Sequence, residues 1–112
     1  FAVIKAVRFG DSEWRMWADF DTIDLLLVDG SSGGQGRAFD WAALAAQRDS
    51  VKAPLVLAGG LTPENVGEAI SLLHPFAVDV SSGVERELGA KDERLIRQFC
   101  LAVAEADRRS AP

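Results

Sequence analysis

The chain has 112 residues, of which 48% are hydrophobic and 26% are charged, and this is the composition of an ordinary globular protein. Its formal net charge of −5 argues against nucleic-acid binding, which relies on clustered lysine and arginine. Cys100 is the single cysteine, which excludes an internal disulfide, and no apolar run approaches the roughly 20 residues that span a bilayer. We expect a cytoplasmic protein without a signal peptide.

The first two apolar runs each lead into a helical pattern. The first run covers residues 2–7, and Asp11-Ser12 then offers an N-cap for a short helix. The second run covers residues 24–28 and is followed by a glycine-rich stretch. Asp40 is expected to cap the helix that comes after this stretch.

The last two apolar runs repeat this arrangement. The third run covers residues 54–58, and Thr62 with Pro63 after it is a strong signal for a helix start. The fourth run covers residues 76–80, and the final helix is expected to begin near Asp92. The predicted order is therefore βαβαβαβα.

The order of the elements indicates the fold class. Short strands that are almost continuously hydrophobic are typical of a parallel sheet flanked by helices, so we predict an α/β fold. Four consecutive strand–helix units predict strands in sequential order. A doubly wound open sheet and a segment of a barrel both fit this pattern. The dinucleotide-binding version is disfavoured, because no GxGxxG follows the first strand.

Two loops at the predicted carboxyl ends of strands have the composition of a phosphate site. Ligands of parallel α/β folds gather at these ends. Gly59-Gly60 follows the third strand and Ser81-Ser82 follows the fourth. Backbone N–H groups can bind phosphate where no Cβ blocks the approach. Either loop alone is better explained as a tight strand exit, but their occurrence on consecutive units shifts the interpretation toward phosphate.

Three charged residues lie in or at the ends of the apolar runs. Asp29 ends the second strand in phase with Leu25 and Leu27, where a carboxyl group can act as a general acid or simply form a turn. Asp79 lies inside the fourth run, so we expect it to need a partner or a ligand. Lys5 lies inside the first run and can bind an anion in a barrel interior or form a structural ion pair, and we favour the structural role.

Several segments resemble the second half of one enzyme family, phosphoribosylanthranilate isomerase. The matching segments are LLLVDGSSGGQGRAFDW at 25–41, PLVLAGGLTPENVGEAI at 54–70 and PFAVDVSSGVERELGAKD at 75–92. VIKAV at 3–7 resembles the family's fifth strand, so the resemblance covers essentially the whole chain. It implies a TIM barrel of the (β/α)8 type, of which residues 1–112 form the C-terminal half-barrel with parallel strands five to eight.

The resemblance also implies an activity. The family converts N-(5-phosphoribosyl)anthranilate to 1-(2-carboxyphenylamino)-1-deoxyribulose 5-phosphate in tryptophan biosynthesis, an Amadori rearrangement that needs no metal or organic cofactor. It implies that Asp29 is the general acid and that Asp79 lies at the anthranilate end of the substrate. The other implied contacts are made by loops, with the substrate at Gly33 and Gly34 and with its phosphate at Gly59, Gly60, Ser81 and Ser82.

One part of the family's pattern is missing. The family's general base is a cysteine in a KICG-type sequence at the end of strand one, which is not found here, and Cys100 in the last helix cannot replace it. We therefore expect the chain alone to be inactive. Its expected partners are the sugar-phosphate substrate and either the missing N-terminal half-barrel or a second copy bound through exposed strand edges. A non-catalytic phosphate-binding half-barrel and part of a bifunctional fusion with indole-glycerol-phosphate synthase remain alternatives.

Overall fold

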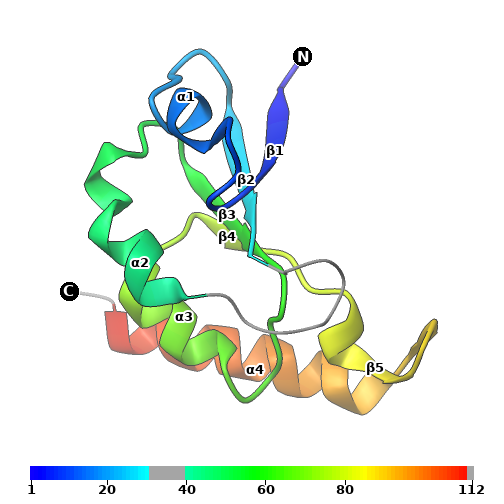
Figure 1. The fold of residues 1–112 in the computed structure, drawn as a ribbon. Helices are drawn as coiled ribbons and strands as arrows, with labels where there is room; N and C mark the ends of the chain where they lie inside the picture. The colour runs from blue at the N-terminus through cyan, green and yellow to red at the C-terminus, as the bar shows by residue number, and fades with distance from the viewer. Residues whose placement is uncertain (31–39, 111–112) are drawn as a thin grey trace.

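Four parallel strands form one sheet in the order β1-β2-β3-β4 (Figure 1). The computed structural model describes residues 1–30 and 40–110. Each strand pairs in parallel with its neighbour in the sequence, which confirms the predicted α/β class and strand order. The strands are β1 (Ile4–Arg8), β2 (Leu25–Asp29), β3 (Leu55–Ala58) and β4 (Ala77–Val78).

Helices pack on one face of this sheet. They are α1 (Trp14–Ala18), α2 (Trp41–Ala46), α3 (Val66–Leu73) and α4 (Glu93–Ser110). Right-handed crossovers between sequential parallel strands place successive helices on the same side of a sheet. The core residues of the strands and of the helices accordingly form one cluster on that side of the sheet.

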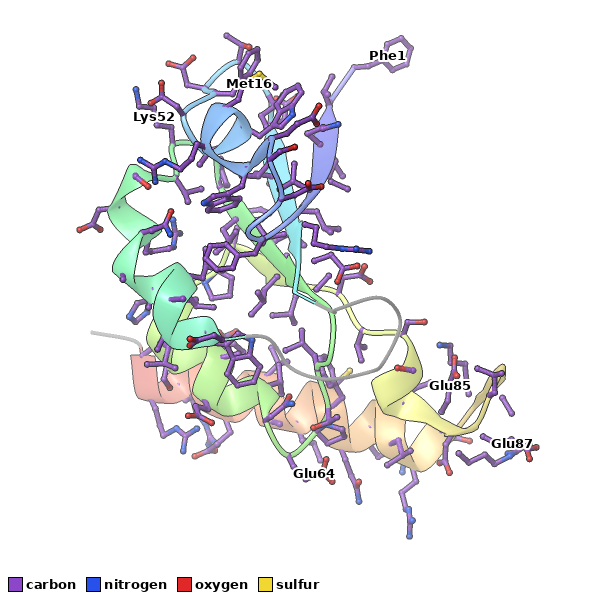
Figure 2. All side chains as sticks on the ribbon, in the orientation of Figure 1. Phe1, Met16, Lys52, Glu64, Glu85 and Glu87 are labelled. Atoms are coloured by element: carbon purple, nitrogen blue, oxygen red, sulfur yellow. The ribbon has the colours of Figure 1, made fainter. Side chains whose placement is uncertain are left out.

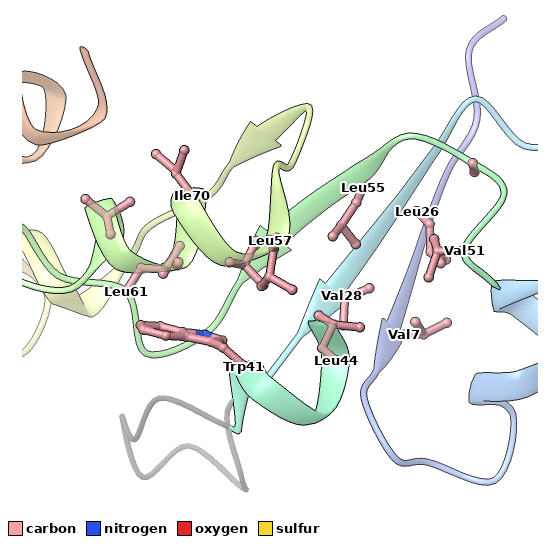
Figure 3. Close-up of a cluster of buried hydrophobic side chains, with 14 of the residues drawn as sticks. Val7, Leu26, Val28, Trp41, Leu44, Val51, Leu55, Leu57, Leu61 and Ile70 are labelled. Carbon is pink, nitrogen blue, oxygen red and sulfur yellow. The ribbon is translucent and has the colours of Figure 1, made fainter. Parts of the chain in front are cut away.

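The hydrophobic core lies between the sheet and these helices. Leu26 and Val28 of β2 and Leu57 of β3 are fully buried, because alternate side chains of a strand point to the same face. In Figure 3 Val28 and Leu57 lie near Leu44 and Trp41 of α2, and Leu26 lies beside Val51. Burial of a leucine or valine side chain stabilises the fold by about 1.5–3 kcal/mol.

Two of the four expected helix starts are confirmed. Asp40 caps α2, since the Ala43 N–H donates a 3.1 Å hydrogen bond to its Oδ1. Asp92 precedes α4 and accepts from the N–H groups of Arg94 and Leu95 at 2.8 and 3.3 Å. In both cases a carboxylate satisfies N–H groups that have no partner within the helix.

The other two helix starts were predicted too early in the sequence. The Asp11 carboxylate accepts from the N–H of its neighbour Ser12 at 2.7 Å, which makes a local turn, and α1 begins only at Trp14. At the third helix the backbone carbonyl of Thr62 accepts from the Val66 N–H, and α3 begins at Val66. Both segments form a turn first, and neither expected side chain caps the helix.

An antiparallel hairpin between β4 and α4 was not predicted. A 3-10 turn at Ser82–Val84 leads into β5 (Glu85–Glu87), which pairs with β6 (Ala90–Lys91). The hairpin projects beyond the end of α4 in Figure 1, and Leu88 at its tip is 99% exposed. Its residues do not alternate between apolar and polar, so hydrophobic periodicity gives no strand signal here.

None of the helices within residues 1–30 and 40–110 is long and apolar enough to cross a membrane.

Candidate functional site

The carboxyl ends of β2, β3 and β4 surround one hollow of about 200 Å³. It is lined by residues from all three strand ends, including Asp29, Asp79, Gly59, Gly60, Ser81 and Ser82. The parallel pairing of the strands brings these loops together, because the strands all end at the same edge of the sheet. Six residues that were predicted from the sequence therefore line the same hollow.

The loop after β3 depends on two consecutive glycines. Gly59 and Gly60 have φ angles of 89° and 71°, a left-handed conformation that strains other residues. Asn65, which was not predicted as a site residue, holds this loop through both the nitrogen and the oxygen of its side-chain amide. Its Nδ2 donates to the Gly60 carbonyl at 2.9 Å, and its Oδ1 accepts from the Thr62 N–H at 2.7 Å. The loop backbone is thus fixed in shape beside the hollow.

The loop after β4 packs directly against the loop after β3. A Cβ built on Gly83 would overlap the Leu61 carbonyl oxygen and lie 2.9 Å from the carbonyl carbon. Only glycine allows this close approach of two backbones. The two loops therefore form one continuous wall of the hollow.

A lysine of the hairpin also contacts the loop after β4. The Lys91 ammonium donates to the Ser81 carbonyl at 2.8 Å and to the Glu85 carboxylate at 2.7 Å. The other carboxylate oxygen of Glu85 accepts from the Gly89 N–H at 3.1 Å. The hydrogen bond from Lys91, followed by that from Gly89, holds the pKa of Glu85 below its ordinary value. Glu85 is therefore ionised at neutral pH.

The two candidate aspartates differ in their surroundings. Asp29 is half-buried at the end of β2, in phase with Leu25 and Leu27 as predicted. Asp79 was expected inside a strand, but β4 ends at Val78 and Asp79 is exposed. In the described sheet β4 is an edge strand that pairs only with β3, so little covers this side chain. The catalytic role of Asp29 and the substrate-binding role of Asp79 remain predictions.

Lys5 lies on the helix side of the sheet, away from the hollow. Its Nζ lies 4.7 Å from the centroid of the Trp17 ring, a cation–π contact. Val7, two residues along the strand, is buried on the same side. This agrees with the structural role that we favoured, although the partner is an aromatic ring and not the expected carboxylate.

Other predicted and unpredicted residues complete the description of this region. Gly33 and Gly34 lie outside the described residues. Arg8 of β1 pairs in register with Asp29, and both line a second hollow beside the first. Arg8 was not predicted as a site residue, although its position at the end of the first strand was a usable signal.

Comparisons with known proteins agree on one family. The family model for N-(5'phosphoribosyl)anthranilate (PRA) isomerase matches residues 1–102. The chain is 50% identical to N-(5'-phosphoribosyl)anthranilate isomerase of Halobacterium salinarum, over 87% of this chain and 47% of the relative. It is 51% identical to the enzyme of that name from Roseiflexus castenholzii, over 95% of this chain and 51% of the relative.

Solved structures give the same result. Phosphoribosyl anthranilate isomerase from Thermotoga maritima superposes with a TM-score of 0.76 at 38% identity, covering 93% of this chain and 52% of that one. Phosphoribosyl anthranilate isomerase from Thermus thermophilus superposes with a TM-score of 0.74 at 34% identity, covering 94% of this chain and 51% of that one. A further structure of phosphoribosyl anthranilate isomerase is a complex with reduced 1-(o-carboxyphenylamino)-1-deoxyribulose 5-phosphate. It superposes with a TM-score of 0.71 at 38% identity, covering 93% of this chain and 49% of that one.

The chain spans about half the length of the curated relatives and solved structures that it matches. The match nevertheless covers most of the chain, in sequence and in three dimensions. This chain belongs to the phosphoribosylanthranilate isomerase family.

Proposed function

We propose that this chain provides the general acid and the phosphate-binding loops of a phosphoribosylanthranilate isomerase. One observation carries the proposal: a carboxylate and two backbone loops from three neighbouring strands line the same hollow. The substrate, N-(5-phosphoribosyl)anthranilate, has the matching groups, since it joins a phosphate to a sugar ring whose oxygen must be protonated. A related isomerase structure with a bound reduced form of the product supports this choice of ligand.

The phosphate is the group that fixes the position of the substrate. Backbone N–H groups of Gly59-Gly60 and Ser81-Ser82 bind it, because glycine leaves the backbone open and the loops are held in shape. Anchoring at this end gives the sugar ring one orientation, which lowers the entropic part of the reaction barrier. The opposite end of the substrate, the anthranilate ring, lies toward Asp79.

Asp29 delivers the first proton. It protonates the ring oxygen, the C1′–O bond breaks, and the nitrogen lone pair forms a Schiff base with C1′. A base then removes the proton from C2′, and the resulting enolamine tautomerises to the ketone. The position of Asp29 at a strand end, beside the anchored sugar, suits the acid role. No metal or organic cofactor is required by these steps.

The general base comes from a second set of four strand–helix units. The chain covers about half of its relatives, and in the described sheet β1 and β4 each pair on one side only. Four further parallel strands would pair with both edges, cover the face opposite the helices and close a barrel of eight strands. In this arrangement residues 1–112 are the C-terminal half-barrel and are inactive alone.

An assay on the chain with and without a complementary half tests this proposal. The chain is co-expressed with the first four strand–helix units of a relative, and conversion of N-(5-phosphoribosyl)anthranilate to the ketose is followed chromatographically. We expect turnover of the combined protein and none with the chain alone. Phosphate binding without turnover of the combined protein would support the non-catalytic alternative. Turnover by the chain alone would show that no second half is needed.

A further inference from the structure

The Lys91 ammonium has three hydrogen-bond acceptors around it. It lies 2.8 Å from the Ser81 carbonyl oxygen, 2.7 Å from Glu85 Oε2 and 3.5 Å from Ser81 Oγ. A lysine ammonium has three N–H donors and no acceptor, so these three contacts match its full donor capacity. The position of this ammonium is therefore specified by both Ser81 and Glu85.

These acceptors come from the two ends of the turn that lines the hollow. Ser81 begins the turn and Glu85 follows it, with Ser82–Val84 between them. The chain that follows Lys91 also bonds to the turn, since the Asp92 N–H donates to the Val84 carbonyl at 2.8 Å. On the other side Gly83 lies against Leu61. The turn is thus held on both sides, and Lys91 holds its first residue.

Hydrophobic burial does not explain why the hairpin lies here. Leu88, at the tip of the hairpin, is 99% exposed, and Arg86 and Glu87 are exposed as well. The hairpin instead places the Lys91 ammonium against the Ser81 carbonyl. A carbonyl oxygen repels a phosphate, whereas backbone N–H groups attract it, so the direction in which this peptide is held affects anion binding.

We propose that Lys91 is a positioning residue for phosphate: by holding the Ser81 carbonyl, it fixes the Ser81-Ser82 backbone in the conformation that binds a phosphate group. The inference rests on the function proposed above, because it concerns the phosphate loop of the same site. Glu85 orients the ammonium and offsets its charge. The effect of Lys91 is therefore mainly geometric.

Three variants of the native protein that carries this chain separate this role from general stabilisation. Lys91→Met removes the ammonium, and Lys91→Arg keeps a cationic donor. Lys52→Met is the matched control, because Lys52 also forms a salt bridge, with Asp19 at 3.1 Å, and its side chain is 54% exposed against 49% for Lys91. Figure 2 shows Lys52 far from Glu85, at the other end of the molecule.

The measurements are the Kd for inorganic phosphate, by calorimetry, and KM and kcat for N-(5-phosphoribosyl)anthranilate. Loss of one hydrogen bond to a charged group predicts a roughly tenfold increase in Kd and KM for Lys91→Met. The kcat value should change by less than about threefold. Lys91→Arg should restore Kd to within about threefold of the wild type. Lys52→Met should change none of these values.

Equal Kd and KM values for Lys91→Met and Lys52→Met would overturn the inference. If Lys91→Met does not fold, Glu85→Gln decides, because it leaves the ammonium but weakens its orientation. A raised phosphate Kd in Glu85→Gln supports the role, and an unchanged Kd contradicts it.

The same data distinguish this inference from the proposed function. Phosphate binding that depends on Lys91 in a protein that does not isomerise the substrate would support the positioning role and contradict the isomerase proposal. Isomerisation with an unchanged KM in Lys91→Met would do the reverse. Absence of both phosphate binding and turnover in the wild type would contradict both.

Discussion

The two faces of the sheet are made from the same strands but differ in what they contact. On the helix side of β2, Leu26 and Val28 are fully buried. On the opposite side, Leu27 and Asp29 are half-buried, and Ile4 of the neighbouring strand is 58% exposed. One residue along a strand thus separates a core position from a position that a ligand can reach.

The residues that stabilise the fold and the residues that line the candidate site lie on different faces of the sheet. Apolar residues on the helix face remove surface from water and account for most of the folding free energy. The other face ends in the two aspartates and the glycine and serine loops around the hollow. Substitutions on the two faces should therefore have different measurable effects, in stability on one and in activity on the other.

The largest effect is expected for Asp29→Asn in the eight-stranded isomerase proposed above. Asparagine keeps the shape of the side chain but cannot deliver a proton, so kcat should fall by a factor of roughly 10² to 10⁴. KM and the midpoint of urea unfolding should change little, because Asp29 lies on the open face. Steady-state kinetics and urea denaturation measure the two properties. A kcat of Asp29→Asn close to the wild-type value would show that Asp29 is not the general acid.

Asp79→Asn is the natural comparison, since Asp79 is exposed at the next strand but one and lines the same hollow. It should raise KM by about two- to tenfold, because it weakens about one ordinary hydrogen bond to the substrate. The kcat value should fall by a smaller factor than KM rises. If Asp79→Asn abolished turnover and Asp29→Asn did not, the two roles would be exchanged.

The converse effect is expected on the helix face. Leu57→Ala removes a fully buried side chain of β3 and should lower the free energy of unfolding by about 2–5 kcal/mol, with phosphate affinity retained in the folded protein. Leu27→Ala, on the open face of β2, should cost less because Leu27 is half-buried. Urea denaturation of both variants tests the comparison. Equal losses of stability would show that the open face is covered as completely as the core.

A smaller effect is expected for Gly60→Val. The left-handed backbone at Gly60 strains a branched residue, and the new side chain would crowd the phosphate site. Distortion or crowding that removes one hydrogen bond to the phosphate predicts a roughly tenfold loss of affinity for the product phosphate. Gly10→Val is the matched control, since Gly10 has φ 86° with open space around it. An equal loss of affinity in both variants would exclude a specific role for Gly60.

The smallest effect concerns the hairpin, which belongs to neither face of the sheet. The pKa of Glu85 is lowered in the folded chain, mainly by the Lys91 hydrogen bond. Its contribution to stability is therefore present above its ordinary value of 4.5 and is lost as the pH falls through the lowered folded value. The protection of the Gly89 amide, measured as its exchange rate relative to the intrinsic rate, should fall over this range in the wild type, and Glu85→Gln should remove this dependence. If the ratio of the Gly89 exchange rates in the wild type and in Glu85→Gln did not change with pH, this prediction would be contradicted.

Local patterns in the sequence determined the architecture of this protein. Four apolar runs with helical patterns between them predicted the parallel sheet, and the period of two predicted the phase of Asp29. Asp40 was recognised as a helix cap because capping involves residues only three apart. Such features depend on residues that are close together in the chain, so they can be predicted from the sequence.

Contacts between distant segments were decided only by the tertiary structure. Asp79 is exposed because β4 is short and lies at an edge, and strand length and edge position depend on pairing with other strands. The turn at Gly83 meets Leu61, and Lys91 meets Ser81, across loops whose paths no periodicity encodes. Hydrophobic patterning specifies which side of an element is buried, whereas the direction of a single polar side chain depends on the three-dimensional position of its acceptor.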